Sequence, residues 1–583
     1  MTATGSQPAG TGTLDFLTAE IAWHRLISIV EEAEAVIAHM SFSPVVGEAR
    51  DYAAALLDSS AEVIAQSPSG IGTFVAILGR AARRVLEIVP KETLQPGDVV
   101  ITNDPWVCAG HLPDVMTLTP IFSGERIIAY ATSIAHMSDL GGQISASARD
   151  LFEEGLRIWP CHLYRAGVEN EDVFQFIRSN SRSPQQVVGD LQAQVAATKL
   201  MGRQVLEALE EHGLPDLDEL SVEIHGRAER AVRNLIERVP DGSYRGEMVC
   251  DGIDEDIQMV ATVTVSGDEL HVDWDGTSEQ VRGGLNCPFT MSLSETAYAL
   301  RIALGGSDLP LVEGAVRPIT VSAPDGSILN PRFPAPVMIR VATAHNIAAT
   351  IFRALEPLVP EYIDPSAISA HYGSCWTFAF RGLDAPTDQN FSRGGPPQMS
   401  GDFVQLYLFN GGTGATGVGD GANALSMPVN CANVPIEVME ARSPFLFERK
   451  ELMPDSGGAG RFRGGLGQRV VVRNLADGAL DFIPRSCGRI LHPPLGLRGG
   501  EPGSGGAITI DGEDVNYRQA HRLEPGQVVV VSVPGGGGFG DPADRPEDEI
   551  LADLEAGYVT AGRVTQAQRP VVLRPPTALP EAA

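Results

Sequence analysis

The chain has 583 residues, of which 43% are hydrophobic, so it can bury several cores and is not a disordered chain. Its 43 basic and 74 acidic residues give a formal charge of −31, which argues against a nucleic-acid partner or an anionic membrane surface. Glycine, proline or charge interrupts every long apolar run, so no transmembrane helix is expected.

The pattern along the chain predicts an α+β, multi-domain fold. Residues 1–13 are small and polar and lack the features of a signal peptide, so we expect a disordered tail and a cytoplasmic protein. Three domains are expected after this tail. They are a mixed α/β domain at 14–240, an α+β domain at 241–400, and a β-rich, glycine-rich domain with a proline-rich tail at 401–583.

Local periodicity places the individual elements. Apolar residues that recur every three or four positions predict helices at 14–40, 70–92, three segments of 170–240, 293–304, 344–356 and 546–556. Runs rich in β-branched residues predict strands at 99–102, 115–122, 126–135, 260–265, 269–274 and 528–533. Past about residue 400 the chain is rich in glycine and strand-like, with few helical patterns.

Two copies of a His-x-x-Asp pattern flank a predicted hairpin. His111-Leu112-Pro113-Asp114 precedes its first strand, and His136-Met137-Ser138-Asp139 follows its second. Folding the hairpin at Gly124 places residue 114 close to residue 134, so both patterns lie at one end of the ribbon. Two imidazoles and a carboxylate at one point are the ligand set of an open catalytic metal site.

One hypothesis is therefore a divalent metal held by His111, Asp114 and His136, with zinc favoured and manganese or iron(II) as alternatives. Asp104 lies in a turn upstream, and Asp139 follows the second histidine. Either could be a fourth ligand or could orient a ligand imidazole, so both are candidate catalytic residues. The simpler alternative is two histidines at strand ends that hydrogen-bond to turns.

The seven cysteines are scattered and form no Cys-x-x-Cys pair. This argues against a disulfide framework or a structural zinc ribbon and suits a reducing compartment. Cys108 lies three residues before His111 and could be a soft metal ligand. We favour the alternative, that it is a small buried residue.

A GxGxxG match occurs at Gly412, Gly414 and Gly417. A dinucleotide site requires a helix directly afterwards, and the following residues do not predict one. We therefore expect a mobile glycine loop, in which Asp420 remains a candidate for function.

The segment Ser456–Gly467 offers backbone N–H groups together with Arg461 and Arg463, so it could cradle an anion. Glycine turns between strands are the interpretation that we favour. No lysine follows a glycine-rich loop, so ATP, if it is used, must bind in another way or on another chain.

Several longer segments carry a family resemblance. The first 200 residues contain GDVVITNDPWVCAGHLPDVMTLTPIF, AHMSDLGG, EEGLRIWP and GDLQAQVAA, and the second half continues with VDWDGTSEQVRGGLN, NVPIEVMEARSPFLFERKELMPDSGGAGRFRGGLGQR and VPGGGGFGDP. In these segments and their order, the chain resembles the hydantoinase B/oxoprolinase family. The resemblance covers nearly the whole chain, and its most specific part is the NDP…HLPD…AHxxDxGG string.

The resemblance implies one subunit of an ATP-dependent cyclic-amide hydrolase, such as an N-methylhydantoinase, a caprolactamase or a bacterial oxoprolinase. It implies a hydantoinase A-type partner subunit, which binds ATP and phosphorylates the lactam oxygen, while the metal subunit directs water onto the activated carbon. It also implies metal ligands at the positions of His111, Asp114 and His136, and a heterotetramer or a larger assembly.

Two alternatives stay open. Related acetone and acetophenone carboxylases use the same pair of subunits on a phosphorylated enol and bicarbonate, and a non-catalytic scaffold would only stabilise the ATP-binding chain. The chain also departs from the family's usual pattern at Trp106–Gly110, His136–Asp139 and 337–350. These changes adjoin the proposed site, so they put the substrate in question more than the reaction type.

Overall fold

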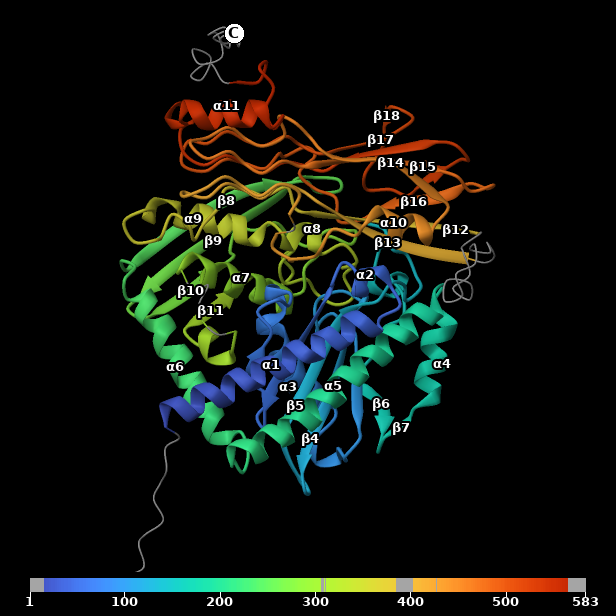
Figure 1. Cartoon of the computed structure of the whole chain (residues 1–583), viewed down its shortest axis with the longest axis vertical. Coiled ribbons are helices and arrows are strands. Elements are labelled where there is room, and N and C mark those ends of the chain that lie inside the picture. The colour runs from blue at the N-terminus through green and yellow to red at the C-terminus, as the bar shows by residue number, and fades with distance from the viewer. Residues whose placement is uncertain (1–14, 306–308, 310, 384–401, 426, 565–583) are drawn as a thin grey trace, which may run out of the picture.

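The computed structural model describes residues 15–305, 309, 311–383, 402–425 and 427–564. Helices and strands alternate in the first half of the chain, and strands dominate after residue 375 (Figure 1). The expected α+β class is therefore confirmed. The predicted tail at 1–13 and most of the proline-rich tail lie outside the described residues. None of the described helices is long and apolar enough to span a membrane.

A seven-stranded sheet organises the N-terminal region, in the order β2-β1-β5-β4-β3-β6-β7. Its strands are β1 (Tyr52–Asp58), β2 (Val63–Gln66), β3 (Val99–Thr102), β4 (Asp114–Ser123), β5 (Arg126–His136), β6 (Cys161–Arg165) and β7 (Val168–Glu169). The helices of this region are α1 (Phe16–Met40), α2 (Pro44–Gly47), α3 (Val75–Ile88), α4 (Glu171–Asn180), α5 (Pro184–His212) and α6 (Asp218–Ile236).

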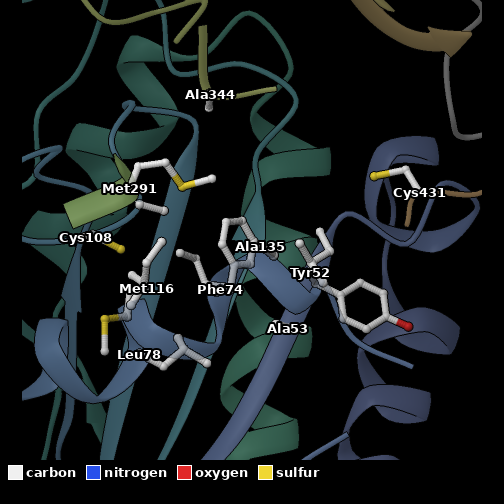
Figure 2. Packing of buried hydrophobic residues seen from close by; sticks show 14 of the residues in the cluster. Tyr52, Ala53, Phe74, Leu78, Cys108, Met116, Ala135, Met291, Ala344 and Cys431 are labelled. Atoms are coloured by element: carbon white, nitrogen blue, oxygen red, sulfur yellow. The ribbon is translucent and has the colours of Figure 1, made fainter. Parts of the chain in front are cut away.

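The two faces of this sheet have different covers. The Thr119 hydroxyl of β4 donates to Thr198 of α5 at 2.9 Å, and Figure 1 shows α1 and α5 crossing in front of the sheet. Met116 lies on the opposite face, because neighbouring side chains of a strand alternate. It belongs to the same buried cluster as Leu78 of α3 and Met291 (Figure 2). Asp114 shares this second face.

The predicted β4–β5 hairpin is confirmed, but its register differs by two residues from the expected one. The turn contains only Gly124 and Glu125, so Ser123 pairs with Arg126. A register shift between Ile121 and Phe122 then gives β5 one extra residue. As a result Asp114 pairs with His136, and not with residue 134.

A second sheet follows in the order β11-β10-β9-β8. Its strands are β8 (Gly242–Cys250), β9 (Ile257–Ser266), β10 (Glu269–Asp273) and β11 (Ile319–Ser322), and the accompanying helices are α7 (Phe289–Ala303), α8 (Val341–Ala344) and α9 (Ile347–Leu355). Helix α9 packs on β8 and β9, and α7 contacts both α9 and α3. Helix α7 therefore connects this region to the second face of the first sheet.

The C-terminal region contains two further sheets, in the orders β13-β12-β16-β19 and β14-β15-β20-β17-β18. Its elements are β12 (Cys375–Leu383), β13 (Asp402–Asn410), α10 (Ile436–Ala441), β14 (Phe445–Leu452), β15 (Gln468–Asn474), β16 (Leu480–Pro484), β17 (Ala507–Ile510), β18 (Glu513–Asp514), β19 (His521–Leu523), β20 (Val528–Ser532) and α11 (Glu547–Glu555). Strands β12 and β13 pair across the boundary expected at residue 400. We propose that this third region begins just before β12.

The glycine-rich segments pack against one another. Gly412 N–H donates to the Pro534 carbonyl (3.0 Å), and Gly465 N–H donates to the Thr413 carbonyl (2.8 Å). A Cβ at Gly465 would lie 2.0 Å from the Ala422 carbonyl oxygen, so only glycine allows this approach. Residues 411–415 are buried, whereas Val418 and Asp420 are exposed, so only the first part of the expected loop is packed inside the region. The described residues 418–425 form no helix.

The arginines of the candidate anion site, Ser456–Gly467, are paired with acidic side chains of the same chain. Arg461 pairs with Glu549 at 2.8 Å, and the Arg463 Nε lies 3.2 Å from the Asp553 carboxylate. Asp420 accepts two hydrogen bonds of 2.8 Å from Arg545. These groups therefore hold α11 and the glycine segments together.

Glu295 of α7 gives a stability prediction. Both of its carboxyl oxygens are buried and have no hydrogen-bond partner in the described part of the chain, and burial raises the pKa to about 8, above the ordinary 4.5. Between these two values the folded chain holds a proton that the unfolded chain releases, so stability falls as the pH rises through this window. We expect Glu295→Gln to remove that pH-dependent loss. Its free energy of unfolding should exceed that of the parent chain by on the order of a few kcal/mol above pH ~8 and should differ little from it near pH ~4.

Urea denaturation across this pH range measures the effect. The exposed Glu279→Gln serves as the matched control and should show no pH-dependent gain. A stability difference between Glu295→Gln and the parent chain that stays constant with pH would contradict the assignment.

Candidate metal centre

Three residues lie in a row across neighbouring strands of the first sheet. Asp51 directly precedes β1, His136 ends β5 and Asp114 begins β4. His136 N–H donates to the Asp51 carbonyl (3.0 Å), and Asp114 pairs with His136 on the other side. Directly opposed residues of neighbouring strands project from the same face, with Cβ atoms about 5 Å apart. The sheet therefore brings these three side chains together.

His111 joins this row from the turn before β4. Its Nε2 lies 2.9 Å from Asp114 Oδ2, and His136 Nδ1 lies 3.1 Å from Asp114 Oδ1. The two imidazole ring centres are 5.1 Å apart. Each of the three residues offers one ligand atom within 4.8 Å of the others, and all three are buried. The structure thus brings together the three residues that the sequence nominated.

The donor set fits a divalent cation. The Nε2 atoms of His111 and His136 are buried, and no hydrogen-bond donor among the described residues reaches them. His111 Nδ1 lies 3.1 Å from the Met338 carbonyl, which can only accept, so Nδ1 carries the proton and Nε2 keeps its lone pair. The close approach of Nε2 to Asp114 is the spacing of about 3 Å expected for two atoms that are each about 2 Å from a shared zinc ion.

The protonation states agree with this fit. Burial lowers the pKa of His111 to about 4, despite the opposing effect of Asp114, so the ring is neutral at pH 7. Burial would raise the pKa of Asp114, but the hydrogen bond from His136 and the charge of Arg340 oppose this effect, and the pKa lies well below its usual range. A neutral imidazole beside a carboxylate is the state in which both groups bind metals.

Sequence reasoning singled out none of four further contributors to the site, although it placed the segment 337–350 beside it. Asp51 Oδ2 lies 3.8 Å from His136 Nδ1, Arg340 Nη2 donates to Asp114 Oδ2 at 2.7 Å, and Met338 supplies its carbonyl. Arg485 is buried nearby, and its Nη2 lies 3.2 Å from Met338 Sδ. The apolar run of β1 could have identified Asp51 as a strand-end residue. The family pattern had marked the segment 337–350 without singling out Arg340 or Met338, and no local signal could have placed Arg485, which comes from a distant part of the chain.

Asp51 also has an altered acidity. Burial raises the pKa of its carboxyl group to about 6, with Asp114 adding to the rise and His136 opposing it. Burial also lowers the pKa of Arg485 to about 10, a value at which the guanidinium stays charged at pH 7. The site therefore combines the buried Asp114 carboxylate and the half-buried Asp51 carboxylate with two buried cations.

Asp104 and Asp139 occupy different surroundings from those expected. The Asp104 carboxylate pairs with Arg157 and accepts from Trp106 N–H (2.9 Å). Asp139 pairs with Arg182 at 2.8 Å and accepts from the Arg182 backbone N–H. None of the hydrogen bonds described for these two carboxylates reaches His111 or His136. They fix the loops on either side of the site.

Cys108 lies in an apolar environment. Figure 2 shows it with Met116 and Met291 in the buried hydrophobic cluster. Burial raises the pKa of its thiol well above the ordinary value, so the thiolate needed for metal binding is disfavoured. These observations support the interpretation of a small buried residue.

A second cluster, Asp58, Glu62 and His225, has similar spacing. Gly314 N–H donates to His225 Nδ1 (3.2 Å), so Nδ1 is the acceptor and Nε2 carries the proton. A metal on Nε2 would have to displace that proton and leave the ring with none. Arg317 already pairs with Glu62 at 2.7 Å. This cluster is therefore a hydrogen-bonded connection between α6 and the β1–β2 turn.

The fold and the buried His-Asp-His cluster define a large α+β protein with an enclosed candidate metal centre. A family model for hydantoinase B/oxoprolinase matches residues 15–542. The chain therefore belongs to the hydantoinase B/oxoprolinase family.

Two relatives and two solved structures illustrate the family. The chain is 30% identical to caprolactamase subunit beta of Pseudomonas jessenii, over 94% of each chain. It is 28% identical to 5-oxoprolinase of Saccharomyces cerevisiae, over 91% of this chain but 42% of the yeast protein. The crystal structure of the Pseudomonas jessenii caprolactamase superposes with a TM-score of 0.79 at 27% identity and covers 96% of this chain and 99% of that one. Acetone carboxylase shares the fold, with a TM-score of 0.80 at 18% identity over 93% of this chain and 78% of that one.

Metal titration tests the cluster. We expect zinc to saturate at one ion per chain and Asp114→Asn to weaken binding by more than the roughly 10–100-fold that loss of an outer contact costs. Asp58→Asn is the matched control, because it removes a buried carboxylate from the second cluster. Weaker binding in Asp58→Asn with unchanged binding in Asp114→Asn would assign the metal to the other cluster.

Proposed function

We propose that this chain is the metal-containing subunit of an ATP-dependent cyclic-amide hydrolase. Its substrate would be a lactam or hydantoin that a partner subunit has phosphorylated. The observation that carries this proposal is the buried His111, Asp114 and His136 cluster, in which no donor among the described residues reaches either Nε2 atom. It occurs in a chain of the hydantoinase B/oxoprolinase family, 30% identical to a caprolactamase subunit beta.

A hydantoinase A-type partner would bind the ATP. The dinucleotide-like motif at Gly412, Gly414 and Gly417 packs against the other glycine-rich segments, where Gly412 N–H already donates to the Pro534 carbonyl. The relative in Pseudomonas jessenii is named as a beta subunit, and the yeast 5-oxoprolinase extends well beyond the region that this chain matches. We propose a heterotetramer or larger assembly in the cytoplasm.

Zinc is the favoured cation at His111, Asp114 and His136, with manganese or iron(II) as alternatives. A cation held there supplies Lewis acidity, which lowers the pKa of water towards about 7 and polarises a carbonyl or phosphoryl oxygen. Asp51 stands beside His136 as a fourth ligand or as the group that accepts the proton from water, and its pKa of about 6 suits the second role at neutral pH.

The remaining residues fit the overall reaction. Water adds to the activated carbon, the ring C–N bond breaks and the nitrogen takes the proton, which leaves an acyl phosphate. A second water would then hydrolyse this acyl phosphate to the carboxylate and phosphate. Arg340 and Arg485 place positive charge where a phosphorylated substrate would bring negative charge. Asp104 and Asp139, which the sequence nominated as catalytic, would hold the flanking loops through Arg157 and Arg182.

Co-expression with the ATP-binding chain tests the function. We expect ring opening of a lactam or hydantoin that requires both chains and ATP and that is lost when the metal is removed with a chelator. ATP consumption that needs bicarbonate and a ketone would instead identify the alternative, a ketone carboxylase subunit. A complex with no stoichiometric metal would favour the scaffold.

Asp51→Asn tests the proposed proton acceptor. We expect kcat to fall by about 10²–10⁴-fold, the usual contribution of a positioned acid or base. Metal content and melting temperature, measured on the same preparation, show whether the loss is chemical. Full activity in Asp51→Asn with metal still bound would exclude this role.

A further inference from the structure

We propose that Glu154 is a positioning residue for the metal centre, because it holds the segment Val337–Arg340 that contacts two of the three candidate ligands. The inference rests on the proposed metal-dependent function. It concerns a residue that lies outside the His-Asp-His cluster and that touches none of its three members directly.

One carboxyl oxygen of Glu154 hydrogen-bonds to the backbone of this segment. Glu154 follows the short 3₁₀ helix η3 (Leu151–Glu153) of the N-terminal region and is buried. Its Oε1 accepts hydrogen bonds from the backbone N–H groups of Val337 and Met338, both at 2.7 Å. A further hydrogen bond joins Leu151 N–H to the Pro334 carbonyl at 2.9 Å. Two chain segments almost 200 residues apart are thereby fixed together.

The segment Val337–Arg340 contacts both His111 and Asp114. The Met338 carbonyl lies 3.1 Å from His111 Nδ1, and Arg340 Nη2 donates to Asp114 Oδ2 at 2.7 Å. Arg340 N–H also donates to the Val337 carbonyl at 3.0 Å, so the segment forms one turn. A shift of this turn would move the partners of His111 and Asp114 together.

The contacts to the ligands are of the kind that tunes metal sites. A carbonyl on the outer ring nitrogen of a histidine sets its tautomer and orientation, and a donor on a ligand carboxylate fixes its rotation. Glu154 therefore acts one step further out, on the backbone that presents both partners. Its removal would leave all three ligands in the chain but would loosen their geometry.

The state of Glu154 suggests an informative substitution. Burial raises the pKa of its carboxyl group to about 8, partly offset by the hydrogen bonds from Met338 and Val337, so the group holds a proton at pH 7. A protonated carboxyl still accepts both N–H bonds through its carbonyl oxygen. The amide of glutamine offers the same oxygen, so Glu154→Gln should preserve the clamp and Glu154→Ala should remove it.

Competition with a chromophoric chelator for zinc, on the purified chain, measures the effect without any need for catalysis. We expect Glu154→Ala to weaken zinc binding by about 10–100-fold and Glu154→Gln to stay close to the parent chain. Glu153→Ala is the matched control, because the neighbouring Glu153 pairs with the exposed Arg149 at the surface. It should bind zinc as tightly as the parent chain.

Parent-like zinc affinity in folded Glu154→Ala, with or without a lower melting temperature, would overturn the inference, because a purely structural role changes only stability. If Glu154→Ala does not fold, Glu154→Asp takes its place. Because the aspartate side chain is shorter, it should hold the Val337–Arg340 segment less well, so this variant should bind zinc less tightly than Glu154→Gln. Parent-like zinc affinity would again overturn the inference. A parent chain that binds no zinc, manganese or iron would instead contradict the proposed function itself.

A double-mutant cycle identifies the route. If Glu154 acts through the turn, Glu154→Ala should cost less zinc affinity in an Arg340→Ala background than in the parent chain. In that background the contact from Arg340 to Asp114 is already absent, and only the Met338 contact to His111 remains to be disturbed. Independent losses that add fully would show that Glu154 does not act through Arg340.

Discussion

The pairing of Asp114 with His136 across β4 and β5 is the contact on which the candidate metal centre depends. It exists because a two-residue turn is combined with one extra residue in β5. Without that extra residue Asp114 would pair with residue 135, and His136 would project from the opposite face of the sheet. Pairing with β1 then places Asp51 on the other side of His136. One irregularity in one hairpin therefore aligns three strands at the site.

Burying this cluster requires compensation from the rest of the fold. An isolated buried carboxylate is costly, and here Arg340 from the second region pairs with Asp114 while Arg485 from the third lies close by. Arg157 and Arg182 do the same for Asp104 and Asp139. Each region thus contributes a charge or a carbonyl to one site, which ties the function of the site to the packing of the whole chain.

The sequence predicted the α+β class, the hairpin and the three candidate ligands, because all three depend on local pattern and on a turn of known geometry. It could not predict the register, since the extra residue at the bulge leaves no compositional mark. The segment 337–350 was expected beside the site, but the contacts of Arg340 and Arg485 could not be predicted, because contacts between residues so far apart in the chain depend on tertiary packing. Asp104 and Asp139 were expected at the site because they are close to the histidines in sequence. In the structure their carboxylates pair with Arg157 and Arg182 instead.

The central claim is that His111, Asp114 and His136 hold one divalent ion. The most direct test is an anomalous difference map from crystals of the zinc-loaded protein, measured on both sides of the zinc absorption edge. The account predicts one strong peak between these three side chains, with Asp51 at its side. A peak at Asp58, Glu62 and His225, or no peak at the three ligands in protein with stoichiometric zinc, would contradict it.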